Sequence, residues 1–308
     1  MLSYRHVFHA GNHADILKHS MLMLILQSLQ KKDKPYTLID THAGAGIYTL
    51  DDERAVKTGE AAEGIVRLLR AADAAPADVP EELLPYLKLC REYEKQGKYP
   101  GSPEIMRNSL RPVDRAQDKL ILLELHNTEI DVLRINMKRT SDSSRIHIHH
   151  RDAYEAMSAL VPPEPKRGLL LMDPSYEVDS DYINVMNSLR EAHRRWTSGI
   201  ICLWYPLLKR RQAETAQLKA ALADCAAKTP SSFMTAELLV DSEDIETGLY
   251  GSGMAVINPP WHLDDSMRNT LPYLASVLAA PQTTTPPNDK VCADTSAEPR
   301  WNVDIRAV

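Results

Sequence analysis

The sequence lacks the features that mark several simple protein classes. No apolar run reaches the roughly 18–20 residues that a membrane-spanning helix needs. The N-terminal segment has no apolar core, so it does not have the pattern of a signal peptide. The four cysteines form no C-x-x-C pair, which argues against a disulfide framework and against a zinc site. We therefore expect a cytoplasmic protein with reduced thiols, no membrane partner and no bound metal.

The sequence also lacks an excess of positive charge. The 36 Lys and Arg residues face 42 Asp and Glu residues, which gives a net charge of -6 at pH 7. This balance excludes a protein that coats nucleic acid by bulk charge, but it allows a local basic surface. The 308 residues, 44% of them hydrophobic, suffice for one large domain or two smaller ones with a buried core.

Segments with the pattern of buried strands alternate with helical patterns along most of the chain. A helix is expected from His13 to about Gln30, with Asn12 as its N-cap. This alternation predicts an α/β fold with a seven-stranded, mostly parallel sheet and helices on both faces. The last two strands are close enough in sequence to form an antiparallel pair at the edge. The seven candidate strands are Tyr36–Ile39, Lys119–Leu125, Arg145–His149, Gly168–Met172, Gly199–Trp204, Phe233–Val240 and Gly253–Asn258.

Two stretches interrupt this alternation. Residues 51–98 are rich in Ala, Glu, Leu and Arg at helical spacing, and they predict a small inserted helical subdomain. It would separate residues 1–50, which hold the N-terminal tail, the first helix and the start of the core, from the remainder of the core at 99–280. Residues 281–308 are rich in Pro and Thr and have no period, so we expect a flexible C-terminal tail.

A glycine turn follows the first strand, in the segment Asp40-Thr-His-Ala-Gly44-Ala-Gly46. Two glycines allow the backbone to approach a ligand closely where a strand leads into a helix. A dinucleotide-binding pattern would need a further glycine at position 49, where the chain has Thr49, and no phosphate-binding P-loop is present. The turn therefore predicts a nucleoside cofactor without a pyrophosphate, and a plain tight turn is the alternative.

Carboxylates end the next two strands. Glu124 closes the second strand, where an acidic residue can accept hydrogen bonds from ribose hydroxyls. Its long offset from Asp40 is explained if the helical segment is an insertion between these strands. Asp152 follows the third strand at the same edge of the sheet. For His147 and His149 on that strand we expect a structural role, because no third metal ligand lies nearby.

The fourth strand ends in Asp173-Pro174-Ser175-Tyr176, which resembles the D-P-P-Y motif of amino-methyltransferases. An exocyclic amine is a poor nucleophile because its lone pair is delocalised into the ring. A carboxylate and the carbonyl of Pro174 that accept its two N–H groups would turn the lone pair toward the methyl donor, and Tyr176 would stack on a base taken out of its helix. Ser175 stands where the second proline is usual, so the rigidity of this loop is in question.

The N-terminal block Met1-Leu-Ser-Tyr-Arg-His-Val-Phe-His-Ala-Gly-Asn-His-Ala-Asp-Ile-Leu-Lys-His19 closely resembles the start of the RlmJ family, whose members form N6-methyladenosine in 23S ribosomal RNA. The likeness covers nearly the whole chain up to about Ala280. It continues through the glycine turn, Tyr-Pro-Gly-Ser-Pro103, Glu-Leu-His126, Asp173-Pro-Ser-Tyr, Leu-Trp-Tyr-Pro206, Ser-Gly-Met254 and Asn-Pro-Pro-Trp261.

The resemblance implies a Rossmann-like class I methyltransferase that uses S-adenosylmethionine and releases S-adenosylhomocysteine. It implies a Lys18 that neutralises the carboxylate of the cofactor, and catalysis by Asp173, Pro174 and Tyr176. Ala153 replaces the glycine that the family has after Asp152, a change that a backbone contact would survive. Together with the glycine turn, the expected cofactor-binding residues are Lys18, His19, His42, Gly44, Gly46, Ser102, Glu124, Asp152, Ala153 and Asp173.

The RNA is expected to meet the N-terminal tail and a basic cluster after the fifth strand; the candidate residues are Tyr4, Arg5, His6, Lys209, Arg210 and Arg211. The resulting interpretation is a monomeric adenine-N6 methyltransferase acting on free or partly assembled 23S ribosomal RNA. Two alternatives stay open. One is an adenine-N6 DNA methyltransferase, because the motif recognises a base and not a sugar. The other is a non-catalytic RNA-binding protein that retains the cofactor pocket. Ser175 keeps this alternative open, because it replaces a proline of the motif.

Overall fold

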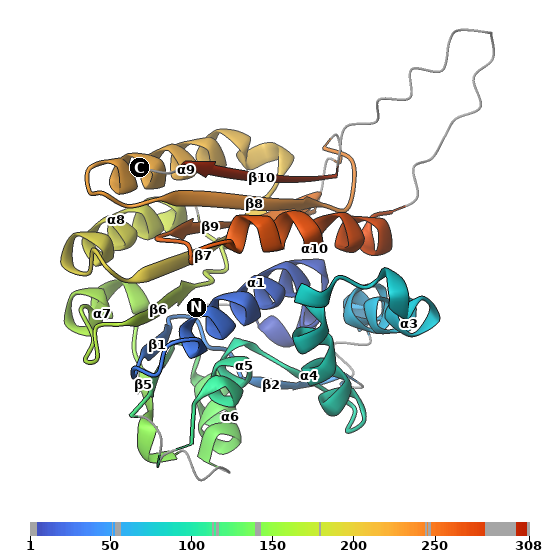
Figure 1. The fold of residues 1–308 in the computed structure, drawn as a ribbon, viewed down its shortest axis with the longest axis horizontal. Helices are drawn as coiled ribbons and strands as arrows, with labels where there is room; N and C mark the ends of the chain where they lie inside the picture. Colours follow the sequence, from blue (N-terminus) through green and yellow to red (C-terminus); the bar gives the residue numbers. More distant parts are fainter. Residues whose placement is uncertain are drawn as a thin grey trace, which may run out of the picture.

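The computed structural model describes residues 5–50, 52, 57–112, 114, 117–138, 143–178, 180–243, 245, 248–280 and 300–306. Its body is one eight-stranded sheet with helices on both faces, which confirms the α/β prediction (Figure 1). The strands are β1 (Thr37–Asp40), β4 (Lys119–Glu124), β5 (Ile146–His150), β6 (Gly168–Met172), β7 (Ile200–Leu207), β8 (Phe233–Leu239), β9 (Gly251–Ile257) and β10 (Trp301–Arg306). They lie in the order β10-β8-β9-β7-β6-β1-β4-β5.

The parallel half of the sheet determines where a ligand can bind. From β1 the chain moves outward to β4 and β5, and it then returns to form β6 on the other side of β1. The direction of strand order therefore reverses between β1 and β6. Ligands of such open sheets bind outside the carboxyl ends of the strands at this switch point. All four residues of β1 are buried, as expected for a strand covered on both faces.

The antiparallel half of the sheet extends beyond the prediction. β8 and β9 pair antiparallel, as expected, and β9 is also antiparallel to β7. The edge position, however, belongs to β10, which pairs antiparallel with β8 and raises the strand number from seven to eight. Its residues alternate between half-buried and exposed positions, with Trp301, Val303 and Ile305 on the packed side. The expectation of a flexible tail was therefore wrong for these six residues, and residues 281–299 lie outside the described part.

Helices cover the two faces of the sheet and form two hydrophobic cores. Successive residues of a strand point to opposite faces of the sheet, and therefore into different cores. Leu38 packs with α1 (His13–Gln30) and α10 (Leu263–Leu278), whereas its neighbour Ile39 packs with α7 (Ala153–Leu160) and α8 (Ser180–Arg195). The α1 helix begins at His13 and is capped by Asn12, as predicted. The helices are α1 (His13–Gln30), α3 (Arg67–Ala74), α4 (Leu84–Glu94), α5 (Ser102–Ser109), α6 (Asn127–Lys138), α7 (Ala153–Leu160), α8 (Ser180–Arg195), α9 (Gln212–Ala227) and α10 (Leu263–Leu278).

The stretch expected to be an insertion carries α3 and α4 between two short strands. These strands, β2 (Ile47–Thr49) and β3 (Lys98–Pro100), pair antiparallel and were not foreseen. A π-helical turn before α3 touches the start of the chain: the Ile65 N–H donates to the Gly11 carbonyl at 2.8 Å. A Cβ on Gly64 would lie 2.0 Å from that carbonyl oxygen, so this approach requires glycine. No helix within the described residues is both long and apolar enough to cross a membrane.

Candidate active site

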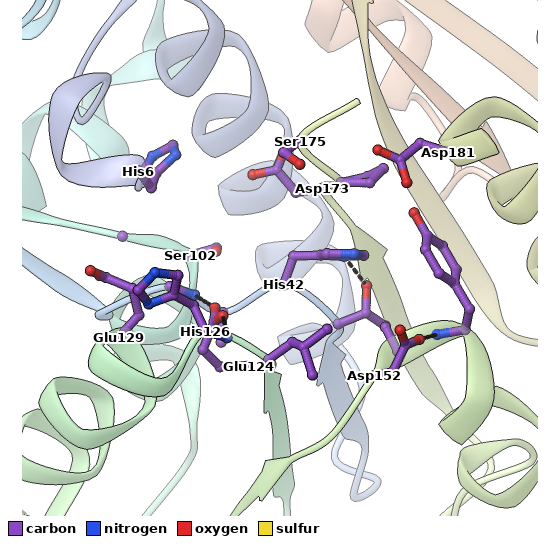
Figure 2. Close-up of a pocket in the computed structure, with 18 of the residues that line it drawn as sticks. His6, His42, Ser102, Glu124, His126, Glu129, Asp152, Asp173, Ser175 and Asp181 are labelled. Atoms are coloured by element: carbon purple, nitrogen blue, oxygen red, sulfur yellow. Dashed lines mark hydrogen bonds between the residues drawn. The ribbon is translucent and has the colours of Figure 1, made fainter. Parts of the chain in front are cut away.

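A cavity of about 330 Å³ opens at the carboxyl ends of β1, β4, β5 and β6, which is the switch point of the sheet (Figure 2). Figure 2 shows Glu124, His126 and Glu129 on one side of it and Asp173 and Asp181 across from them. The cavity brings together eleven of the site residues expected from the sequence, namely His6, Lys18, His19, His42, Gly44, Ser102, Glu124, Asp152, Ala153, Asp173 and Pro174.

Other expected residues do not line the cavity. Gly46 lies behind it, with φ +78°, and its carbonyl accepts the Gly101 N–H at 2.9 Å. Arg5 precedes the short helical turn His6–Phe8. The basic cluster Lys209–Arg211 forms a helical turn just after β7, at the same edge of the sheet as Asp173 but outside the cavity lining. Tyr4 lies outside the described residues.

The glycine turn and Glu124 form one rigid unit. Gly44 has φ +57°, and a Cβ on it would lie 2.2 Å from the Tyr48 hydroxyl, so this position requires glycine. The two oxygens of Glu124 accept backbone N–H groups, Oε2 from Gly44 and Oε1 from His126, each at 2.7 Å. Burial raises the pKa of Glu124 above its usual value, although these two bonds oppose the shift.

Asp152 and His42 form the neighbouring wall. Asp152 Oδ1 accepts the N–H groups of Tyr154 at 2.7 Å and Glu155 at 3.3 Å, which caps α7 and fixes the carboxylate at the cavity. The His42 ring packs edge-on to Tyr154 with centroids 5.9 Å apart. Burial lowers the pKa of His42 to about 4, so its imidazole is neutral at pH 7.

Lys18 holds the carboxylate of the Asp173-Pro174-Ser175-Tyr176 motif. Its Nζ forms ion pairs with Asp173 and, at 2.8 Å, with Asp15 Oδ1. Burial alone would lower the pKa of Lys18, but the two carboxylates outweigh burial and hold it above its usual value. In this structure the Lys18 ammonium is thus already engaged by two side chains of the protein.

His19 and Asp40 are buried polar groups with unused atoms. His19 Nδ1 bonds the Tyr99 hydroxyl at 2.7 Å, and its Nε2 has no hydrogen-bond partner within the described part of the chain. Burial lowers the pKa of His19 to about 3, so the ring is neutral. Asp40 is fully buried at the end of β1, and burial raises its pKa to about 6. Buried polar atoms without a hydrogen bond are uncommon, and of these two residues His19 lines the cavity, where its Nε2 is available to a ligand.

Tyr176 does not line the cavity. It has a positive φ of 52°, and its hydroxyl donates to the Trp204 carbonyl at 3.1 Å. Its ring packs against Tyr182 with centroids 4.7 Å apart. The predicted stacking of Tyr176 on a bound base stays a prediction, because in this structure its ring contacts Tyr182 and not the cavity lining.

Several cavity residues were missed by the sequence analysis. His126, Glu129 and Tyr154 lie within five residues of a strand end that the analysis had already singled out, so position was the available signal for these three; Tyr48, Asp181 and Asn184 belong to the elements that follow, β2 and α8. Among the described residues, no group of three or more His, Cys, Asp or Glu side chains is arranged to hold a metal ion. The missed residues include Tyr48, His126, Glu129, Tyr154, Asp181 and Asn184.

Comparison with known proteins gives consistent matches along the chain. A family model described as "Ribosomal RNA large subunit methyltransferase D, RlmJ" matches residues 33–287. Ribosomal RNA large subunit methyltransferase J of Escherichia coli K12 is 42% identical over 281 residues, covering 90% of this chain and 94% of that protein. The Haemophilus influenzae protein of the same name is 39% identical over 282 residues, with the same coverage. A crystal structure of a Legionella pneumophila protein superposes with a TM-score of 0.76 at 29% identity, over 97% of this chain and 98% of that one.

Proposed function

The chain belongs to the family described as ribosomal RNA large subunit methyltransferase D, RlmJ, and we propose that it methylates the N6 atom of an adenine in 23S ribosomal RNA with S-adenosylmethionine. The observation that carries this proposal is the position of Asp173-Pro174-Ser175-Tyr176. The motif ends a buried strand at the switch point, and Asp173 and Pro174 line the cavity there. The carboxylate thus lies where an open α/β sheet binds its ligands.

The residues present fit S-adenosylmethionine. The backbone of Gly44 and the carboxylate of Glu124 form a rigid edge that suits a ribose, and Asp152 lies next to them. The Nε2 of His19, which makes no hydrogen bond to the described residues and lies 3.9 Å from Asp15 Oδ1, offers a further polar contact in the cavity lining. The cavity of about 330 Å³ lies at the lower end of the range for small-molecule sites. When bound, the cofactor supplies an electrophilic methyl group on a sulfonium.

The chain's own groups make the adenine amine reactive. Asp173 and the carbonyl of Pro174 accept its two N–H groups, which favours a pyramidal nitrogen whose lone pair points at the methyl group. The N–C bond would form as the methyl–sulfur bond of the sulfonium breaks and leaves the thioether S-adenosylhomocysteine. The nitrogen then loses one proton, and the Asp173 carboxylate that accepts that N–H is the group to receive it. Orientation by these fixed polar groups is the main source of rate enhancement in such a site.

The RNA would reach this site along two basic segments. Arg5 and His6 precede α1, and His6 lines the cavity. Lys209, Arg210 and Arg211 follow β7 at the same sheet edge as Asp173, where they can contact phosphates on either side of a base taken out of its stack. The net charge of -6 means that affinity depends on these local groups and falls with salt.

The test is to incubate the pure protein with radiolabelled S-adenosylmethionine and unmodified 23S ribosomal RNA, with DNA as a parallel substrate, and to digest the products to nucleosides. We expect label in N6-methyladenosine from the RNA alone. Label from DNA alone would contradict the proposed substrate and support a DNA methyltransferase. Absence of label from a protein that binds the cofactor would contradict catalysis and support an RNA-binding role.

A further inference from the structure

Asp15 lies at the centre of the polar contacts behind the cavity. It is the third residue of α1, and only 1% of its surface is exposed. Its Oδ2 accepts the Gly11 N–H at 2.9 Å and bonds His6 Nε2 at 3.0 Å. Its Oδ1 lies 2.8 Å from Lys18 Nζ. One buried carboxylate thus holds a residue of the N-terminal segment and a residue one helical turn further along α1.

Both side chains that Asp15 holds face the cavity. Lys18 connects Asp15 to Asp173, the residue that follows β6 and lies 155 positions after Lys18 in sequence. His6 lies in the cavity lining (Figure 2). The four side chains therefore form a continuous chain of polar contacts from His6 through Asp15 and Lys18 to Asp173.

We propose that Asp15 is a positioning residue for methyl transfer, which holds Lys18 and His6 at the places where they meet Asp173 and the substrate. This inference rests on the proposed function. Asp15 does not line the cavity and therefore acts through side chains that do, namely Lys18, His6 and, more weakly, His19, whose Nε2 lies 3.9 Å from Asp15 Oδ1. The long Lys18 side chain has many rotamers, and an ion pair at its end selects the one that reaches Asp173. A displacement of about 1 Å in such a site reduces the rate by about 100-fold.

The chain offers a matched control for the loss of a buried charge. Asp118 is fully buried, accepts the Tyr36 N–H at 3.1 Å and pairs with Arg111 at 2.7 Å. It precedes β4 at the end of the sheet opposite the cavity. Asp15→Asn and Asp118→Asn therefore remove the same kind of group with similar partners, one beside the site and one away from it.

The experiment compares these two variants with the wild type by kcat, the KM for S-adenosylmethionine, and the thermal unfolding temperature. Both variants should be less stable. Asp15→Asn should lose about 10- to 100-fold in kcat with less than about a threefold change in cofactor KM, and Asp118→Asn should keep the wild-type kcat. Asp15→Glu retains the charge and should regain part of the loss. A wild-type kcat in Asp15→Asn, or an equal loss in Asp118→Asn, would overturn the proposal.

Two further readouts keep the proposal testable. If Asp15→Asn does not fold, a kcat for Asp15→Glu at least threefold below the wild type, with unchanged cofactor KM, supports it, and a wild-type kcat overturns it. A crystal structure of the Asp15→Asn variant needs no activity: Lys18 Nζ or His6 Nε2 should move by about 1 Å or more. Unmoved side chains would overturn the proposal, whereas a wild-type protein that methylates no RNA would refute only the proposed function.

Discussion

The cavity has two sides that are held in different ways. On the cofactor side, made by Glu124 and Asp152 with the Gly44 turn, each carboxylate accepts two backbone N–H groups. On the motif side, made by Lys18 and Asp173, the charged groups bond other side chains. A backbone amide cannot leave its strand or turn, but a lysine can change rotamer. For the proposed methyltransferase, this comparison predicts a cofactor site that the backbone holds in place, beside a motif side where the contact of Lys18 can change when a base enters.

The largest expected effect separates chemistry from cofactor binding. Asp173→Asn keeps the size of the side chain and one acceptor oxygen, but it removes the negative charge and the carboxylate that would take the proton of the amine. Methyl transfer should fall by about 1000-fold, because a preorganised polar group at the reacting atoms is lost. The affinity for S-adenosylhomocysteine, measured by calorimetry, should change by less than about threefold. Transfer within tenfold of the wild type would show that the motif side does not carry the chemistry.

The reverse effect is expected on the cofactor side. Glu124→Gln replaces a charged acceptor for ribose hydroxyls with a neutral one, a change of about 1.5–3 kcal/mol or about 10- to 100-fold in cofactor affinity. The kcat at saturating cofactor should stay within about threefold of the wild type. Glu155→Gln, at an exposed position of α7, is the matched control and should change neither quantity. If Glu124→Gln lowers kcat and leaves the KM unchanged, the two sides are not separable.

A smaller effect is expected from the basic cluster Lys209–Arg211, because changing it weakens RNA binding and leaves both sides of the cavity unchanged. Changing Lys209, Arg210 and Arg211 together to alanine should weaken RNA binding by about tenfold and reduce the slope of log K against log salt by about 2. The control changes three exposed arginines of α8, which carry the same charge on a helix face; they are Arg190, Arg194 and Arg195. Filter binding over a series of salt concentrations measures both slopes. An unchanged slope in the variant without Lys209, Arg210 and Arg211 would show that the RNA binds another surface.

The smallest effect concerns Asp40, which lies at the end of β1 between the two sides. Burial raises its pKa to about 6, so the folded protein binds the proton more tightly than the unfolded chain. Ionisation of Asp40 therefore costs stability as the pH rises through about 6, and this cost is absent near pH 4 and below. Asp40→Asn should raise the free energy of unfolding by about 1–3 kcal/mol at pH 8 and by much less near pH 4. Denaturant unfolding at both pH values would test this, and an equal effect at both would contradict it.

The sequence predicted the elements that local patterns encode. Asn12 marked the start of α1 as an N-cap. Apolar runs that end in Glu124 or Asp173 marked the ends of two strands. Because parallel strands end at the same edge of the sheet, these ends predicted which residues line the cavity. The contact between Lys18 and Asp173 joins residues 155 positions apart, and no local pattern encodes it. β10 had a signal, the alternation at Trp301, Val303 and Ile305, but it follows a Pro- and Thr-rich stretch that resembles a loose tail.

Local sequence patterns could not predict the orientation of the Tyr176 ring, for a different reason. The sequence places an aromatic ring after the strand, but the ring direction depends on the backbone at φ 52° and on packing against Tyr182 and Trp204. These partners come from α8 and β7, whose positions follow only from the assembled sheet. The motif therefore placed an aromatic residue after the strand but did not predict the direction of its ring.

The division of the cavity is tested most directly by single-turnover methyl transfer at saturating S-adenosylmethionine, with Asp173→Asn and Glu124→Gln assayed side by side on unmodified 23S ribosomal RNA. Saturation compensates for a loss of cofactor affinity, but it does not replace a group that acts on the amine. The account predicts that Glu124→Gln regains nearly the wild-type rate and that Asp173→Asn remains about 1000-fold slower. Equal recovery of the two variants, or recovery of Asp173→Asn alone, would contradict it.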